Sequence, residues 1–95
     1  MLDVRRMRVL REVAAQGSFS AAATALNFTQ SAVSQHVAAL EREAGTQLVE
    51  RGRRGVRLTD AGRVLVAHAD AILARIDSAE EELAAWPACA ADACG

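Results

Sequence analysis

The sequence predicts a mainly α-helical fold with three helices, a short β-hairpin and one long C-terminal helix. Apolar residues recur at helical spacing in four segments, two short extended runs flank a Gly-bounded tip within 48–58, and the last segment carries an apolar heptad repeat. The 95 residues suffice for one small domain. Although 52% are hydrophobic, 22 of these residues are Ala, so the predicted core is thin.

The net charge of −1 conceals a separation between the two ends of the chain. Residues 1–63 hold ten Arg against six acidic residues and carry +4, whereas residues 64–95 hold one Arg against six and carry −5. A concentration of Arg in one region favours an anionic partner such as nucleic acid. The basic part therefore marks the expected binding end.

Several functional classes are not expected from this sequence. No apolar run approaches the roughly 20 residues that cross a bilayer, and Arg residues interrupt the N-terminal apolar pattern, so no signal peptide or membrane contact is expected and the predicted location is cytoplasmic. Cys89 and Cys94 are too few for a disulfide scaffold. His36 and His68 lack partners at ligand spacing, so no metal or cofactor is expected. Without a nucleophile elbow or a phosphate-binding Gly loop, the protein is predicted not to be an enzyme.

The first two predicted helices are bounded by capping residues. Asp3 suits an N-cap and Gly17 suits a C′ position, so the first helix is expected over about 4–16. A serine at 18 or 20 can cap a second, Ala-rich helix over about 19–26. Asn27 suits the left-handed exit of that helix, and Phe28 is expected to point back at the core.

The third predicted helix begins after Thr29 and ends at Gly45. A helix, a short helix, a tight turn and a third helix form the order of a helix-turn-helix, here at about 18–43. Small side chains allow a helix into a major groove of about 12 Å, where Gln can read base edges and Ser or Thr can bond phosphates. The candidate contacts are Thr29, Gln30, Ser31, Ala32, Ser34 and Gln35. A solvated polar face on an ordinary three-helix bundle is the alternative.

The predicted hairpin, 48–58, carries three Arg residues near its tip. Beside a helix-turn-helix such a hairpin forms the wing of a winged helix-turn-helix. Arg53 and Arg54 can then reach a minor groove, where narrow A·T tracts concentrate negative potential. The alternative is a solvated basic loop. Glu41, on the third helix, is expected to pair with an Arg of the wing or of the first helix.

The last predicted helix, 60–86, is about 40 Å long at about 1.5 Å per residue and is stopped by Pro87. Its apolar side chains alternate in spacings of four and three, which is a heptad seam. The seam consists of Leu65, Ala69, Ile72, Ile76, Ala79, Leu83 and Trp86. A monomer would leave much of this seam exposed, so it predicts a symmetric homodimer.

Two stretches, GSFSAAATALNFTQSAVSQHVAALEREAGT at 17–46 and LVERGRRGVRLTDAG at 48–62, resemble the DNA-binding domain of LysR-type transcriptional regulators. The resemblance covers about 2–86. It implies a winged helix-turn-helix over 1–58 and a linker or dimerisation helix over 59–86. Residues 87–95 are expected to form a disordered tail.

The resemblance also implies roles for individual residues. Gln30 matches the base reader, Ser34 a phosphate contact, and Arg54 the wing residue that enters the minor groove. Arg51 and Arg53 match phosphate partners. Gln35 stands where many relatives have Arg, and Gln favours adenine on geometry.

The predicted function is a dimeric, sequence-specific DNA-binding transcriptional regulator that reads an interrupted inverted repeat. The resemblance further implies an effector domain after the linker helix. This sequence does not include that domain, so we expect it to be either the DNA-binding segment of a longer regulator or a naturally short protein. No small-molecule site is therefore predicted. A higher oligomer is left open for a full-length form. The alternative is an interaction module that sequesters a related regulator. The operator, the regulated genes, the inducer and the direction of regulation are not specified by the sequence.

Overall fold

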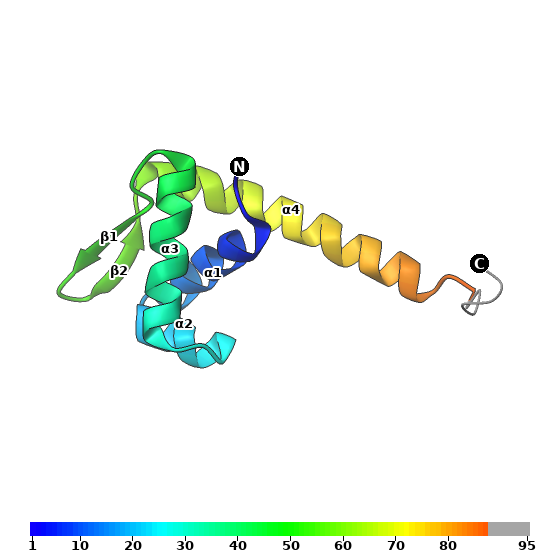
Figure 1. Ribbon diagram of the computed structural model, residues 1–95, viewed down its shortest axis with the longest axis horizontal. Coiled ribbons are helices and arrows are strands. Elements are labelled where there is room, and N and C mark those ends of the chain that lie inside the picture. Colours follow the sequence, from blue (N-terminus) through cyan, green and yellow to red (C-terminus); the bar gives the residue numbers. More distant parts are fainter. Residues whose placement is uncertain (88–95) are drawn as a thin grey trace.

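The structure, a computed structural model, describes residues 1–87 and confirms the predicted winged helix-turn-helix followed by a long helix (Figure 1). Its elements are α1 (Val4–Gln16), α2 (Phe19–Leu26), α3 (Gln30–Ala44), β1 (Val49–Gly52), β2 (Gly55–Leu58) and α4 (Asp60–Ala84). Apart from Pro87, the tail predicted at 87–95 lies outside the described residues, as do both cysteines.

Every helix begins at a residue whose side chain accepts a hydrogen bond from a backbone N–H of the first turn. These N-caps are Asp3, Ser18, Thr29 and Thr59. At Asp3 the backbone N–H of Arg5 is the main influence that holds the pKa of the carboxyl below its ordinary value. The first three helices end at residues in the left-handed region, namely Gly17, Asn27 and Gly45.

The core is formed where α1, α2 and α3 meet the base of the hairpin and the N-terminal half of α4. Its largest fully buried side chains are Leu10, Leu40, Leu48, Leu73, Val13, Val33 and Val37. Phe28 is an exception to the sequence prediction, because its side chain is 44% exposed and its ring stacks on His36 at 5.8 Å between centroids. The left-handed turn at Asn27 therefore directs Phe28 outward and not into the core.

The hairpin is joined to the helical body at the junction of α1 and α2. β1 and β2 pair antiparallel, with Gly52 opposite Gly55. The backbone N–H of Val56 donates to the Gly17 carbonyl at 2.9 Å. Gly55 has φ +120°, and a β-carbon there would collide with the same carbonyl oxygen. Glycine at 55 is therefore needed both for the backbone conformation and for this close approach.

The prediction that Glu41 pairs with an arginine of the wing or of the first helix is wrong. Its carboxylate instead accepts hydrogen bonds from the backbone N–H groups of Leu48, at 2.7 Å, and Val49, at 3.3 Å. The chain turns at Gly45 and brings these two donors over the carboxylate, so Glu41 satisfies backbone groups at the start of β1. Glu43 is the residue that reaches the first helix, where it pairs with Arg6.

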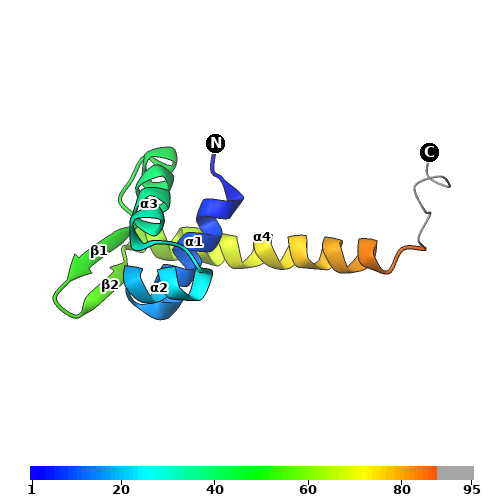
Figure 2. The same ribbon diagram turned by 60° about the horizontal axis from the view of Figure 1, so that its bottom comes forward.

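The helix α4 leaves the body part of the way along its length. Near its N-terminus Gly62 lies against the Leu48 carbonyl, where any β-carbon would collide. Ala69 and Leu73 are fully buried, and Asp70 pairs with Arg11 of α1 at 3.7 Å. Beyond them α4 extends away from the body on the side opposite the hairpin, as both ribbon views show (Figures 1 and 2). It ends at Ala84, two residues before the predicted end.

Candidate nucleic-acid interface

The N-terminal turn of α3 presents a polar surface to solvent. Gln30, Ser31 and Gln35 are exposed, and Ala32 is half-buried. The Thr29 hydroxyl accepts a hydrogen bond from the Ala32 N–H at 3.0 Å. Its own O–H hydrogen stays available as a donor, because a hydroxyl both donates and accepts. The turn therefore combines free amide side chains with hydroxyl donors, as base and phosphate contacts require.

Three elements meet around Arg51. Its Nη2 donates to the Ser34 Oγ at 3.1 Å, and its guanidinium lies over the Phe19 ring with Cζ 4.3 Å from the centroid. Arg51 belongs to β1, Ser34 to α3 and Phe19 to the first turn of α2. The hairpin is thus joined directly to the helix that carries the polar surface.

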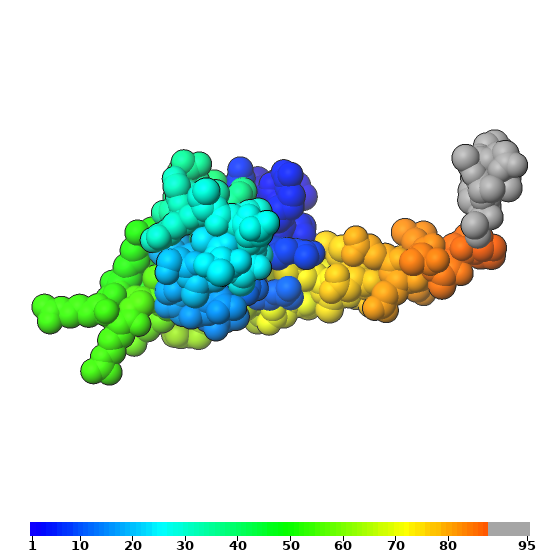
Figure 3. Space-filling view, turned by 90° about the horizontal axis from the view of Figure 1, so that it is seen from below, coloured from blue at the N-terminus to red at the C-terminus, as the bar shows by residue number. Residues whose placement is uncertain are grey.

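The hairpin tip is a two-residue loop formed by Arg53 and Arg54, both exposed. Within residues 1–87 neither side chain takes part in an ion pair, whereas Arg57 on β2 pairs with Glu50 across the hairpin at 3.8 Å. Figure 3 shows the hairpin projecting beyond the helical body, so both tip guanidinium groups are free to contact a partner.

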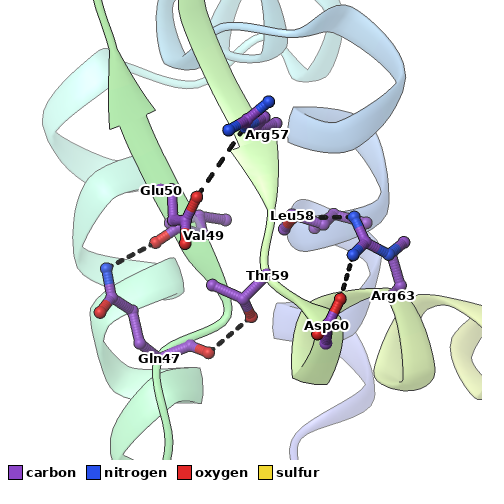
Figure 4. Close-up of polar contacts among 8 residues, drawn as sticks. All are labelled: Gln47, Val49, Glu50, Arg57, Leu58, Thr59, Asp60 and Arg63. Carbon is purple, nitrogen blue, oxygen red and sulfur yellow. Dashed lines mark hydrogen bonds and ion pairs between the residues drawn. The ribbon is translucent and has the colours of Figure 1, made fainter.

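The base of the hairpin is fixed to the start of α4 by side-chain hydrogen bonds (Figure 4). The Thr59 hydroxyl donates to the Gln47 carbonyl at 2.7 Å and accepts from the Gly62 N–H at 3.0 Å. The Gln47 side-chain amide donates to the Val49 carbonyl at 2.8 Å. Thr59 therefore caps α4 and ties it to the segment that enters β1.

The structure brings the predicted contacts of α3 together with Arg51 through Ser34, and it places the tip arginines on the adjoining hairpin. Sequence reasoning missed Phe19, whose ring lies under the Arg51 guanidinium, and Arg57, which pairs with Glu50 across the hairpin. The alternation of the hairpin strands could have indicated a cross-strand partner for Glu50. No comparable signal pointed to Phe19, because its contact with Arg51 joins separate elements.

The predicted seam of α4 divides into two parts. Leu65 packs against the core and Ala69 is fully buried within the same chain, so Ala69 has no exposed surface here to offer a partner. Leu73, which the heptad pattern leaves out, is also fully buried. The seam members beyond Ala69 are all exposed or half-buried, namely Ile72, Ile76, Ala79, Leu83 and, just past the end of α4, Trp86.

The last turns of α4 are acidic as well as apolar. Glu80, Glu81 and Glu82 are exposed there, beside Leu83 and Trp86, whose side chains are 69% and 67% exposed. This end lies away from the hairpin (Figure 1). The charge separation in the sequence is therefore also a separation in space, and phosphates would be repelled from this end.

No helix within residues 1–87 has the length and apolar character needed to span a membrane. No three His, Cys, Asp or Glu side chains gather there as a set of metal ligands.

A helix-turn-helix with an adjoining basic hairpin defines the class of winged helix-turn-helix DNA-binding domains. The family model for bacterial regulatory helix-turn-helix proteins of the lysR family matches residues 4–63, and the chain belongs to this family. The described fold is that of the family's DNA-binding domain, and the family consists of transcriptional regulators and not of enzymes.

Similar proteins are transcriptional regulators several times longer than this chain. The nitrogen assimilation regulatory protein nac of Escherichia coli K12 is 42% identical over 79 residues, which cover 83% of this chain and 26% of that protein. A probable RuBisCO transcriptional regulator of Chlorokybus atmophyticus is 44% identical over 72 residues, covering 76% and 23%. The chain thus spans about a quarter of the length of the curated relatives it matches.

Solved structures of LysR-family DNA-binding domains on DNA share this fold. The complex of the CbnR DNA-binding domain with DNA matches with a TM-score of 0.82 and 31% identity, covering 88% of this chain and 97% of that one. The complex of the BenM DNA-binding domain with its benA site 1 matches with a TM-score of 0.81 and 32% identity, covering 86% and 95%.

Proposed function

We propose that this domain binds double-stranded DNA as a dimer and regulates transcription by reading an interrupted inverted repeat. The observation that carries the proposal is the joined polar surface described above, in which the exposed turn of α3 adjoins a hairpin with two unpaired arginines at its tip. The two neighbouring structures on DNA support it. A DNA-bound role would place the protein in the cytoplasm.

In this proposal the N-terminal turn of α3 enters the major groove. Gln30 and Gln35 read base edges, with adenine preferred on geometry. Thr29, Ser31 and Ser34 bond the flanking phosphates, and half-buried Ala32 allows the helix to approach the bases closely. Arg54 enters the adjoining minor groove, and Arg51 and Arg53 contact phosphates.

The dimer follows from the distal part of α4. Ile72, Ile76, Ala79 and Leu83 form an apolar strip on this helix, which Trp86 continues just past its end, and the strip stays exposed or half-buried among residues 1–87. A second copy can cover it with the same strip, because a twofold interface uses one surface twice. Two α3 helices related in this way would meet successive major grooves, which is the reason for expecting an inverted repeat.

Fluorescence anisotropy tests the DNA contacts. The wild-type chain is titrated against a duplex enriched by that chain from a randomised pool and against a scrambled duplex, at low and raised salt. Arg54→Ala should weaken binding to both duplexes and reduce the slope of log affinity against log salt by about one. Gln30→Ala should cost about 1–3 kcal/mol on the enriched duplex and little on the scrambled one.

Arg75→Ala is the matched control, because Arg75 is an exposed arginine on the distal part of α4. It should bind both duplexes much as the wild type does. Wild-type affinity in both Arg54→Ala and Gln30→Ala would reject the proposed contact surface. Undetectable binding of the wild type to any duplex at low salt would instead favour the interaction module, a role that the exposed Leu83 and Trp86 can also serve.

A further inference from the structure

We propose that Arg51 is a positioning residue that sets the angle between the hairpin and α3, and that it does so by resting on Phe19 and bonding Ser34. This three-residue contact is called the Arg51 brace below. The inference rests on the proposed DNA-binding function. Besides the phosphate contact proposed for Arg51, it gives this residue a positioning role that does not depend on its charge alone.

The brace joins the two-stranded hairpin to the helix-turn-helix. Phe19 is 6% exposed and occupies the first turn of α2, where the Ser18 cap and the surrounding core hold it. The guanidinium of Arg51 covers this ring at 4.3 Å, and one of its N–H groups donates to Ser34 at 3.1 Å. Both partners belong to the helix-turn-helix, so a movement of β1 against it would break both contacts.

The hairpin needs such support, because two strands alone are marginally stable in water. Its other attachments lie elsewhere: Val56 bonds to Gly17 on the side of β2, and Thr59 bonds to Gln47 at the base. At the start of β1, Glu41 of α3 also accepts a hydrogen bond from the Val49 N–H. The Arg51 brace is the attachment to α3 that lies two residues nearer the hairpin tip. Without it the β1 side of the hairpin near the tip would lose its contact with the helices, and ordering that part on DNA would lower the affinity.

Arginine suits this role for a chemical reason. Its planar guanidinium stacks on an aromatic face while donating from its edge, whereas the Lys ammonium is a point charge with no plane to stack. Only one of its five N–H donors is used by Ser34, so the remaining donors can still face a phosphate. Arg51→Lys therefore keeps the charge and removes the planar contact.

The experiment compares Arg51→Lys and Phe19→Leu with the wild type. Phe19→Leu removes the ring without changing any charge, and Phe19 is too buried to contact DNA itself. Leu10→Met is the matched control, since Leu10 is a fully buried residue of α1 and is not one of the three residues of the brace. Affinity for the enriched duplex and its salt slope are measured by anisotropy. Hydrogen exchange of the Val56 amide is measured without DNA, and thermal melting verifies that each variant is folded.

The brace predicts that Arg51→Lys and Phe19→Leu each weaken binding about fivefold, with an unchanged salt slope and faster exchange at Val56. Leu10→Met should change neither affinity nor exchange at Val56. Wild-type affinity and wild-type exchange in both variants would overturn the brace, even if Arg54→Ala weakens binding as the proposed function requires.

The two proposals fail in different ways. If the wild type binds no duplex, the proposed function fails, and exchange at Val56 alone decides whether Arg51 holds the hairpin. If Arg51→Lys is neutral while Arg51→Ala lowers both affinity and salt slope, Arg51 is a phosphate contact only and the brace is wrong. Because Arg51 is exposed, its variants test the brace even if Phe19→Leu does not fold.

Discussion

The body of the domain, residues 1–73, and the arm formed by residues 74–87 are stabilised in different ways. The body buries leucine and valine side chains of α1, α3, β1 and α4 together with Phe19 of α2, and within the described residues no buried side-chain polar atom lacks a hydrogen-bond partner. The arm leaves Leu83 and Trp86 largely exposed beside three glutamates. The body is therefore complete within one chain, whereas the arm has an apolar surface that a partner can cover.

This difference indicates how the two tasks of the protein are divided. A short helix without tertiary packing is marginal in water, so the arm gains stability when it binds another molecule. In the proposed function the body holds α3 and the hairpin in a fixed relation for contact with DNA. Mutations should accordingly affect folding in the body and association in the arm.

The largest expected effect is a loss of core volume in the body. Leu40→Ala should lower the free energy of unfolding by about 3 kcal/mol, because Leu40 is fully buried in the centre of the core. Leu83→Ala makes the same chemical change in the arm and should leave the unfolding of the monomer nearly unchanged. Urea denaturation at low protein concentration measures both, and equal losses would contradict the distinction between body and arm.

A second prediction tests the close contact between α4 and the hairpin base. Gly62→Ala should destabilise the body by about 2 kcal/mol, because the new β-carbon would collide with the Leu48 carbonyl. Gly52→Ala is the matched control, since its β-carbon would meet only the Gly55 carbonyl oxygen, at an ordinary 3.8 Å. Thermal melting of the two variants compares them. A melting temperature for Gly62→Ala equal to that of the control would show that the backbone at this junction rearranges at little cost in stability.

A third prediction concerns association through the arm. Leu83→Ser should raise the dissociation constant of the dimer about tenfold, or about 1.4 kcal/mol, because it places a hydroxyl in an apolar interface. Ala74→Ser, on the opposite side of α4, should leave the constant unchanged. Sedimentation equilibrium gives both values. If the two variants dimerise alike, the partner does not bind the predicted strip.

The smallest expected effect is at the boundary between hairpin and α4. Thr59→Ala removes both the N-cap of α4 and the hydrogen bond to Gln47, and should cost about 1 kcal/mol of stability. Thr24→Ala deletes an exposed hydroxyl that bonds only within its own helix, so it should change stability less. Chemical denaturation can separate these values. A greater loss for Thr24→Ala would mean that Thr59 does not fix the start of α4.

The sequence predicted the elements well because their ends are locally determined. Asp3, Thr29 and Thr59 cap their helices through hydrogen bonds to residues two or three positions away, and Gly17 and Gly45 end theirs by backbone conformation. The arginines of the hairpin tip were likewise visible, since Gly52 and Gly55 flank them. Such features need no knowledge of the tertiary structure.

Contacts between distant segments could not be predicted in this way. Glu41 bonds backbone N–H groups at the start of β1, and Glu43 pairs with Arg6, although the sequence favoured an arginine for Glu41. On α4 the heptad spacing identified an apolar strip. It did not predict which of its residues are buried within the same chain, and it omitted Leu73. Helical periodicity specifies which residues share a face, whereas their partners depend on how the helices pack.

Selection of bound sequences from a randomised duplex pool tests most directly the claim that the body reads DNA and the arm pairs two copies. If this claim holds, the pool is enriched in two inverted half-sites at a fixed separation, and Leu83→Ser weakens enrichment of the second half-site. Enrichment of one asymmetric site by the wild-type chain, or no enrichment at any salt concentration, would contradict it.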